Sequence, residues 1–140
     1  MSEVINFHYD VDGDDFTSAG EASVNVKKKL RQLGVDPAII RRVSIAMYEG
    51  EVNMVIHANG GYVDVNVYGD KIEIILTDEG PGIENVELAM QEGYSTAPDY
   101  VRSLGFGAGM GLPNMKSYTD EMNIETEIGV GTTITMIVNL

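Results

Sequence analysis

The sequence has no cysteine and only two histidines among its 140 residues. Without cysteine, the chain cannot form disulfides, zinc–thiolate sites, iron–sulfur clusters or a cysteine nucleophile. Two histidines, His8 and His57, are too few for a metal site built from imidazoles. No apolar run approaches the roughly 18 residues that span a bilayer, and the acidic, mixed start (residues 1–4) does not fit a signal peptide. We therefore expect a cytoplasmic protein without membrane contact.

Basic residues are also scarce in this chain. It has 9 lysines and arginines against 22 aspartates and glutamates, which gives a net charge of −13. A surface of this sign repels the phosphate backbone of nucleic acids and of anionic membranes. A small phosphate ligand remains compatible, because backbone N–H groups and a divalent cation can hold it. We therefore expect no nucleic-acid partner.

The length and the hydrophobic share of 44% suit a single domain over residues 1–140 with one core. Alternation and turn residues predict strands, and helical periodicity with start and stop residues, such as the cap Asp36 and the stop Gly34, predicts helices. The predicted strands are 3–9, 62–68, 71–77, 122–128 and 132–140, and the predicted helices are 16–33, 37–58, 84–91 and 112–119. Helices followed by adjacent strands favour an α+β two-layer sandwich, with a mixed β-sheet and the helices on one face.

An acidic segment, Asp10 to Asp15, separates the first strand from the first helix. Its aspartates have part of the spacing of a calcium-binding loop that would end at Glu21. The sixth position of such a loop needs glycine for a sharp turn, and here it is Asp15. We therefore interpret the segment as a solvated acidic turn.

Glu49 and Asn53 form the first of four polar motifs. A spacing of four on a helix places their side chains on one ridge, with Cβ atoms about 5–6 Å apart. An amide oxygen suits Mg²⁺, and a carboxylate can accept a proton from an attacking hydroxyl. Apolar neighbours on the same side, Ile45, Val52 and Ile56, would raise the pKa of Glu49 toward that of a working base. A solvated helix surface is the alternative interpretation.

Two further motifs lie at the ends of predicted strands. Asp78-x-Gly80-x-Gly82 follows a strand, so that its carboxylate can accept a hydrogen bond from an exocyclic amine and its glycines allow close backbone approach. The alternative is a plain Asp-x-Gly turn. The segment 129–132, which ends in Thr132, connects the last two strands as a tight hairpin. Its threonine hydroxyl is also a candidate ligand contact.

The remaining motif is a run of alternating glycines before a helix. Gly105, Gly107, Gly109 and Gly111 leave a backbone that can wrap anionic oxygens, and Leu112 follows them. The run is not a dinucleotide-binding fingerprint, because no strand precedes it directly. It is not a Walker A loop either, because no Gly-Lys-Ser/Thr follows. A flexible hinge is less consistent with the large apolar residues between the glycines.

In their order along the chain, with the glycine run third and the segment 129–132 last, the four motifs resemble the ATP-binding domain shared by DNA gyrase, the gyrase-like heat-shock chaperones, histidine kinases and the MutL repair protein. The resemblance covers residues 36–140 and implies the Bergerat-type fold of this GHKL superfamily. The segments 92–96 and 109–115 are similar to those of the small serine kinases that regulate bacterial sigma factors and the stressosome. A pair of dimerisation helices carrying a phospho-accepting histidine, which histidine kinases have, is missing from the sequence.

The resemblance implies a role for each motif. Glu49 would be the general base, Asn53 the Mg²⁺ ligand and Asp78 the acceptor for the adenine amine. A lid over the phosphates would span about residues 93–111, with Arg102 reaching the γ-phosphate of ATP as a further catalytic residue. The other implied nucleotide-binding residues are Gly80, Gly82, Ser95, Thr96, Gly105, Gly107, Gly109, Met110, Gly111, Leu112 and Thr132. Glu51 is a second carboxylate near the proposed base, but its spacing of two from Asn53 points it off the ridge.

The function implied by the resemblance is an ATP-dependent serine/threonine-protein kinase of the anti-sigma-factor type. It would transfer the γ-phosphate of ATP to a serine of a small partner with a STAS-type, anti-anti-sigma-like domain. The alternative is a nucleotide-gated module that captures a sigma factor or another regulator without catalysis. Residues 97–104 make the lid longer than in the switch-type kinases that the chain otherwise resembles. These small kinases are often dimers, so a homodimer is an open possibility.

Overall fold

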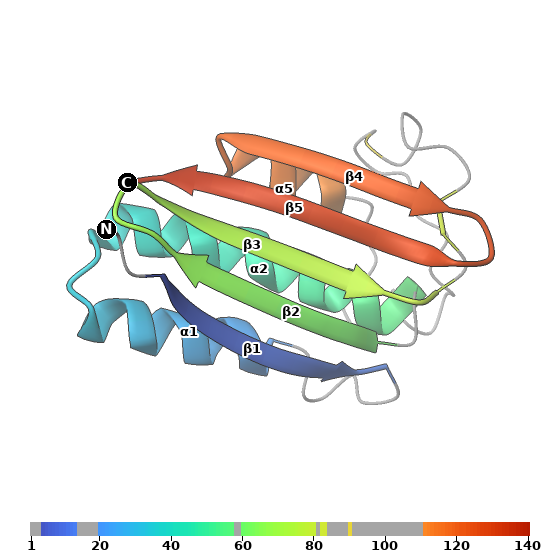
Figure 1. Ribbon diagram of the computed structural model, residues 1–140, viewed down its shortest axis with the longest axis horizontal. Helices are drawn as coiled ribbons and strands as arrows, with labels where there is room; N and C mark the ends of the chain where they lie inside the picture. The colour runs from blue at the N-terminus through green and yellow to red at the C-terminus, as the bar shows by residue number, and fades with distance from the viewer. Residues whose placement is uncertain (1–3, 14–19, 58–59, 81, 84–89, 91–110) are drawn as a thin grey trace.

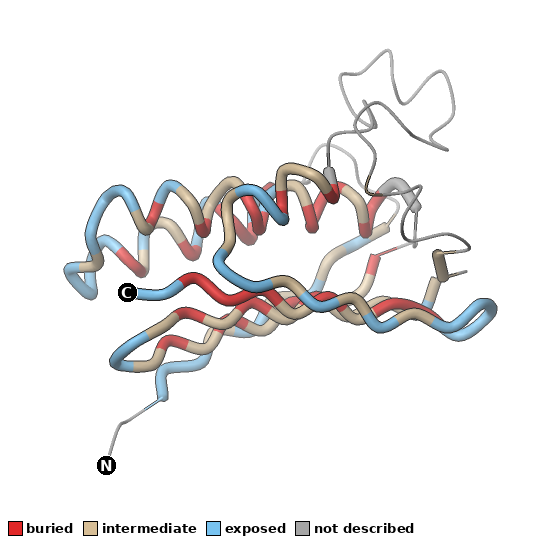
Figure 2. The backbone as a smooth tube through the Cα atoms, turned by 90° about the horizontal axis from the view of Figure 1, so that it is seen from above, coloured by how far each residue is buried: buried red, intermediate tan, exposed pale blue. Residues whose placement is uncertain are grey.

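The computed structural model describes residues 4–13, 20–57, 60–80, 82–83, 90 and 111–140. These residues form five strands and three helices, with all three helices on one face of a single sheet (Figures 1 and 2). The strands are β1 (Ile5–Asp12), β2 (Gly60–Val67), β3 (Lys71–Asp78), β4 (Glu121–Glu127) and β5 (Gly131–Asn139). The helices are α1 (Glu21–Gln32), α2 (Pro37–His57) and α5 (Gly111–Ser117). This arrangement confirms the predicted α+β two-layer sandwich.

The strand directions correct one part of the prediction. The sheet order is β1-β2-β3-β5-β4, and every neighbouring pair is antiparallel, so the described sheet is not mixed. β3 and β4 do run in the same direction, as expected for two strands joined by a helical crossover. However, β5 returns from the β4 hairpin into the space between them. It therefore pairs antiparallel with both.

The core lies between the sheet and the helices. Alternate residues of β2, β3 and β5 point into it, and α1, α2 and α5 each contribute one apolar stripe. Four methionines are buried there, at positions 47, 54, 115 and 136, which supports a packing role for these flexible side chains. No helix in the described part of the chain is both long and apolar enough to cross a membrane.

The helix boundaries follow mostly from local signals. The Asp36 side chain accepts a hydrogen bond from the Ala38 N–H at 2.8 Å, which confirms the predicted cap of α2. Gly34 adopts a positive φ of 78° after the end of α1, as its role as a stop signal requires. The beginning of α1 is different. The helix begins at Glu21, and residues 16–19 of the predicted segment lie outside the described residues.

Strand β1 is longer than predicted. It continues through Asp10 to Asp12, so these two residues lie in a strand and not in an acidic turn. The extension forms because β1 pairs with β2 as far as Gly60 and because Val11 packs against the core. Within the described ranges, no group of three or more His, Asp or Glu side chains is arranged to bind a metal ion.

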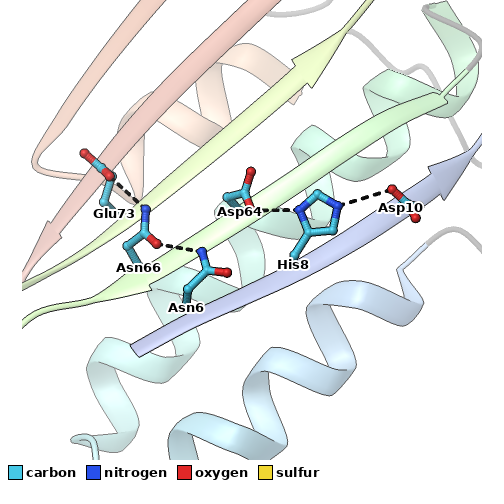
Figure 3. A network of polar contacts seen from close by, with 6 residues as sticks. All are labelled: Asn6, His8, Asp10, Asp64, Asn66 and Glu73. Carbon is cyan, nitrogen blue, oxygen red and sulfur yellow. Dashed lines mark hydrogen bonds and ion pairs between the residues drawn. The ribbon is translucent and has the colours of Figure 1, made fainter. Parts of the chain in front are cut away.

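The helix-free face of the sheet carries a ladder of polar side chains across β1, β2 and β3 (Figure 3). Asn6 donates to Asn66 at 2.7 Å, and Asn66 in turn donates to Glu73 at 3.1 Å. A second group surrounds His8. Its Nδ1 lies 2.7 Å from Asp64, and its Nε2 lies 3.3 Å from Asp10. Only the protonated imidazolium can donate to both carboxylates at once.

Because of this pairing, we expect His8 to contribute to the stability of the fold in a pH-dependent way. The hydrogen bond to Asp64 is the main reason why the pKa of His8 is raised above the ordinary 6.5, and Asp10 raises it further. A raised pKa in the folded state stabilises the fold below pH 6.5, and the contribution is lost as the pH rises through the folded-state pKa. The free energies of unfolding of the wild type and His8→Gln, measured with urea, should therefore differ more at pH 5.5 than at pH 8.5. If the two free energies differ by the same amount at both pH values, the pairing is contradicted.

Candidate functional site

The described residues of the four predicted motifs come together at one end of the molecule. The end of β3, the β4–β5 turn, the beginning of α5 and the C-terminal half of α2 all lie at the end opposite the two chain termini (Figure 1). Chain segments that are far apart in the sequence therefore supply the candidate site. Of these motifs, the glycine run is described only at Gly111, where α5 begins.

Asp78 is the centre of the first half of this site. Its Oδ1 accepts hydrogen bonds from the backbone N–H groups of Gly80 at 3.0 Å and Thr132 at 3.2 Å. Asp78 and Thr132 are also register partners in the β3–β5 pair. Within the described residues Oδ2 accepts no hydrogen bond, so this oxygen is available to a ligand. Burial raises the pKa of the carboxyl, and the two backbone hydrogen bonds partly offset the increase.

Two threonines and two glycines connect the Asp78 loop to the β4–β5 hairpin. The Thr126 hydroxyl accepts from the Ile83 N–H at 2.9 Å and lies 2.9 Å from the Thr132 hydroxyl. Gly131 has a φ of 149°, and a Cβ there would collide with the Asp78 carbonyl. At Gly82, with a φ of 83°, a Cβ would lie 2.7 Å from the Glu127 carbonyl oxygen. These glycines are required by the protein's own backbone packing, whatever ligand binds beside them.

Glu49 and Asn114 form the second half of the site. The Asn114 side-chain amide on α5 donates a hydrogen bond to Glu49 Oε1 on α2 at 3.3 Å. Glu49 is half-buried, and this burial raises its pKa, while the Asn114 hydrogen bond lowers it. The direction agrees with the expectation from the apolar neighbours of Glu49. Asn114 was missed in the sequence analysis because nothing in its local spacing connects it to a helix 65 positions away.

Asn53 lies one turn beyond Glu49 on α2 and is partly exposed. Leu112 is buried in the hydrophobic core, so only its backbone remains available to a ligand. Several predicted site residues lie outside the described residues, together with residues 84–89 and 91 of the predicted 84–91 helix and residues 93–110 of the predicted lid. These residues are Ser95, Thr96, Arg102, Gly105, Gly107, Gly109 and Met110.

Glu51 is buried and does not compete with Glu49 for the role of base. It is 2% exposed, and its carboxylate accepts three backbone N–H groups at the beginning of α1. The donors are Gly20 at 2.8 Å, Ala22 at 3.2 Å and Ser23 at 3.0 Å. Gly20 itself provides no side-chain cap, so Glu51 caps α1 from another helix. Burial raises the pKa of Glu51, and these hydrogen bonds oppose the increase.

Replacing Glu51 with glutamine should destabilise the fold. The glutamine NH₂ group would face buried N–H donors, which leaves at least one of them without an acceptor and costs about 1–2 kcal/mol. Urea unfolding should show a lower midpoint for Glu51→Gln and an unchanged midpoint for Glu125→Gln, which alters an exposed carboxylate on β4. Equal midpoints for both variants would mean that the cap contributes nothing.

The model of the histidine kinase-like ATPase domain family matches residues 15–138 of this sequence, and the chain therefore belongs to this family. Its relatives include the anti-sigma F factor of Anoxybacillus flavithermus, which is 32% identical over 127 residues and aligns over 85% of this chain and 82% of that protein. The serine/threonine-protein kinase RsbT of Bacillus subtilis is also 32% identical over 127 residues, covering 88% and 87% of the two chains.

Solved structures agree with this assignment at the level of the fold. The RsbU and RsbW domains of a Mycobacterium tuberculosis protein match with a TM-score of 0.66 at 18% identity, over 96% of this chain and 32% of that one. The mycobacterial sensor histidine kinase MprB matches with a TM-score of 0.55 at 18% identity, over 96% and 97% of the two chains. At this level of identity the likeness establishes the shared fold only.

Proposed function

We propose that this chain is an ATP-dependent serine/threonine-protein kinase of the anti-sigma regulator type. The observation that carries the proposal is the site itself. In a chain of this ATPase family, two partly buried carboxylates, Glu49 on α2 and Asp78 at the end of β3, belong to elements that meet at the same end of the molecule (Figure 1). RsbT, a relative at 32% identity over most of both chains, is a serine/threonine-protein kinase.

The Asp78 loop fits an adenine base. Oδ1 is held by two backbone N–H groups, so Oδ2 can accept from the exocyclic amine of adenine. Thr132 is the register partner of Asp78, and its hydroxyl is proposed as a second polar contact for the base. Guanine carries a carbonyl oxygen where adenine has the amine, and this oxygen would face the carboxylate unfavourably. The site therefore favours ATP over GTP.

The described residues also fit Mg²⁺ as a companion of ATP. Mg²⁺ keeps most of its waters and takes one or two protein oxygens together with the substrate phosphates. Asn53, which is partly exposed one turn beyond Glu49, would supply one such oxygen. When bound, Mg²⁺ neutralises charge on the phosphates. This matters in a chain of net charge −13, with few lysines and arginines for that purpose.

In the proposed reaction, Glu49 acts on the hydroxyl of the acceptor serine or threonine. The hydroxyl oxygen forms a bond to the γ-phosphorus as the bond from that phosphorus to the β,γ-bridging oxygen breaks. The hydroxyl proton passes to Glu49, and ADP is the leaving group. Arg102 and the amides of Gly107, Gly109 and Gly111 are proposed to hold the phosphates. The proposed acceptor is a small protein with an anti-anti-sigma-like, STAS-type domain.

Several relatives are anti-sigma F factors, and this favours protein binding as a second candidate function. One of them, from Clostridium acetobutylicum, is 39% identical over 109 residues and aligns over 73% of both chains. In this alternative the chain binds a sigma factor or another regulator in a nucleotide-dependent manner and transfers no phosphate. A kinase and a binding module can also be the same molecule, because one site can serve both functions.

Calorimetric titration of the purified chain with ATP, with and without Mg²⁺, tests the nucleotide site. We expect binding in the micromolar range that is stronger with Mg²⁺. Incubation with radiolabelled ATP and the anti-anti-sigma-type proteins of the same genome then separates the two functions. Label on an acceptor serine or threonine supports the kinase. Partner affinity that differs between ATP and ADP without any transfer supports the binding module, and the absence of ATP binding rejects both.

A further inference from the structure

Glu49 has one hydrogen-bond partner within the described residues, and that partner lies on another helix. Asn114 donates to Oε1 at 3.3 Å, whereas Oε2 receives no hydrogen bond from the described part of the chain. The two carboxylate oxygens are therefore not equivalent. One is held by a neutral donor, and the other is available to accept a proton.

The packing around this pair fixes the distance between its two helices. Next to Glu49 in the sequence is Gly50, and next to Asn114 is Met115. A Cβ at Gly50 would lie 3.2 Å from the Met115 Cε and 2.5 Å from the Leu76 Cδ2. Glycine at this position thus allows α5 and β3 to approach α2 closely. This approach brings the short Asn114 side chain within reach of Glu49.

The segment that follows α5 is held against α2 as well. Arg42 on α2 donates through Nε to the Tyr118 carbonyl at 3.1 Å and pairs through Nη2 with Asp120 at 3.1 Å. Met115, next to Asn114, is fully buried and makes the contact with Gly50. Because Met115 and the segment after α5 both contact α2, Asn114 cannot move away from Glu49 without disturbing the core.

We infer that Asn114 is a positioning residue for Glu49. Asn114 holds Oε1 of this carboxylate and leaves Oε2 to face the hydroxyl proton of the acceptor. The inference rests on the proposed function, in which Glu49 is the base. A carboxylate that turns freely about its last side-chain bond presents the correct oxygen only part of the time, and misplacement of a reacting group reduces the rate steeply. The Asn114 donor removes this freedom. It also offsets part of the pKa increase that burial gives Glu49.

The test compares Asn114→Asp and Asn114→Ala with the wild type under the phosphotransfer conditions described above. Asn114→Asp keeps the shape of the side chain and loses the donor. We expect kcat to fall about 10-fold in both variants, while the KM for ATP stays within about 2-fold, because Asn114 orients the base and does not hold the nucleotide. Asn114→Gln keeps a donor and should restore part of the rate. Lys116→Ala, an exposed change on the same helix, should have no effect.

A double-mutant cycle and a spectroscopic measurement separate failure of the inference from failure of the proposed function. If Asn114 acts through Glu49, adding Asn114→Ala to Glu49→Gln causes no further loss of rate. The Asn114 side-chain amide resonances should also shift in Glu49→Gln, even without an acceptor protein. A Glu49-dependent rate that Asn114→Ala leaves unchanged, or additive losses in the cycle, overturns the inference and leaves the kinase intact. Transfer that is unaffected by Glu49→Gln rejects the proposed role of Glu49 and the inference with it.

Discussion

Replacing Glu49 with glutamine is expected to leave ATP affinity nearly unchanged and to lower phosphotransfer by about 10²–10⁴-fold. Glutamine has the same shape and can still accept the Asn114 hydrogen bond through its amide oxygen. It cannot take the hydroxyl proton, so the change removes the base and little else. Calorimetry with ATP and initial rates of label transfer measure the two quantities separately.

The matched control for this change is Glu125→Gln, which neutralises an exposed carboxylate on β4 and should alter neither quantity. The pH dependence provides a second check. Burial raises the pKa of Glu49, and the base must be deprotonated to act, so the wild-type rate should fall as the pH drops through this raised value. Transfer by Glu49→Gln at the wild-type rate would remove Glu49 from the mechanism.

Replacing Asp78 with asparagine is expected to weaken ATP binding by about 100-fold. The asparagine oxygen can keep both backbone hydrogen bonds, from Gly80 and Thr132, and the loop should therefore fold as before. Its NH₂ group then takes the place of Oδ2, and two donors face each other where the adenine amine would bind. The same NH₂ group can donate to the carbonyl oxygen of guanine, so the preference for ATP over GTP should also decrease.

Calorimetric titrations with ATP and GTP, alongside a thermal unfolding curve for each variant, test this expectation. Asp70→Asn is the matched control, because it makes the same chemical change at the exposed β2–β3 turn. An ATP affinity within about threefold of wild type in Asp78→Asn would show that Asp78 is not the base-recognising group. A large drop in the unfolding temperature would show instead that its main role is to hold the loop.

Local patterns in the sequence predicted most of the elements and part of the site. The Asp36 cap, the Gly34 stop and the alternating strands depend on neighbouring residues, and the structure confirms them. The capping role of Glu51 was not predicted because its partners, the first N–H groups of α1, lie about 30 positions earlier in the chain. Asn114 was missed for the same reason. The strand directions also depend on a distant event, the return of β5 between β3 and β4.

The position of β5 also determines when the nucleotide site can form during synthesis. Asp78 is on β3, but the residue that completes its hydrogen bonds, Thr132, follows 54 positions later. A nascent chain that ends before β5 has no neighbour for β3 on that side and no partner for β4. Such long-range pairing forms late in folding. ATP at the proposed site could therefore stabilise only the finished chain, and a chain truncated before Thr132 would lose the proposed adenine contact together with the strand that joins β3 to β4.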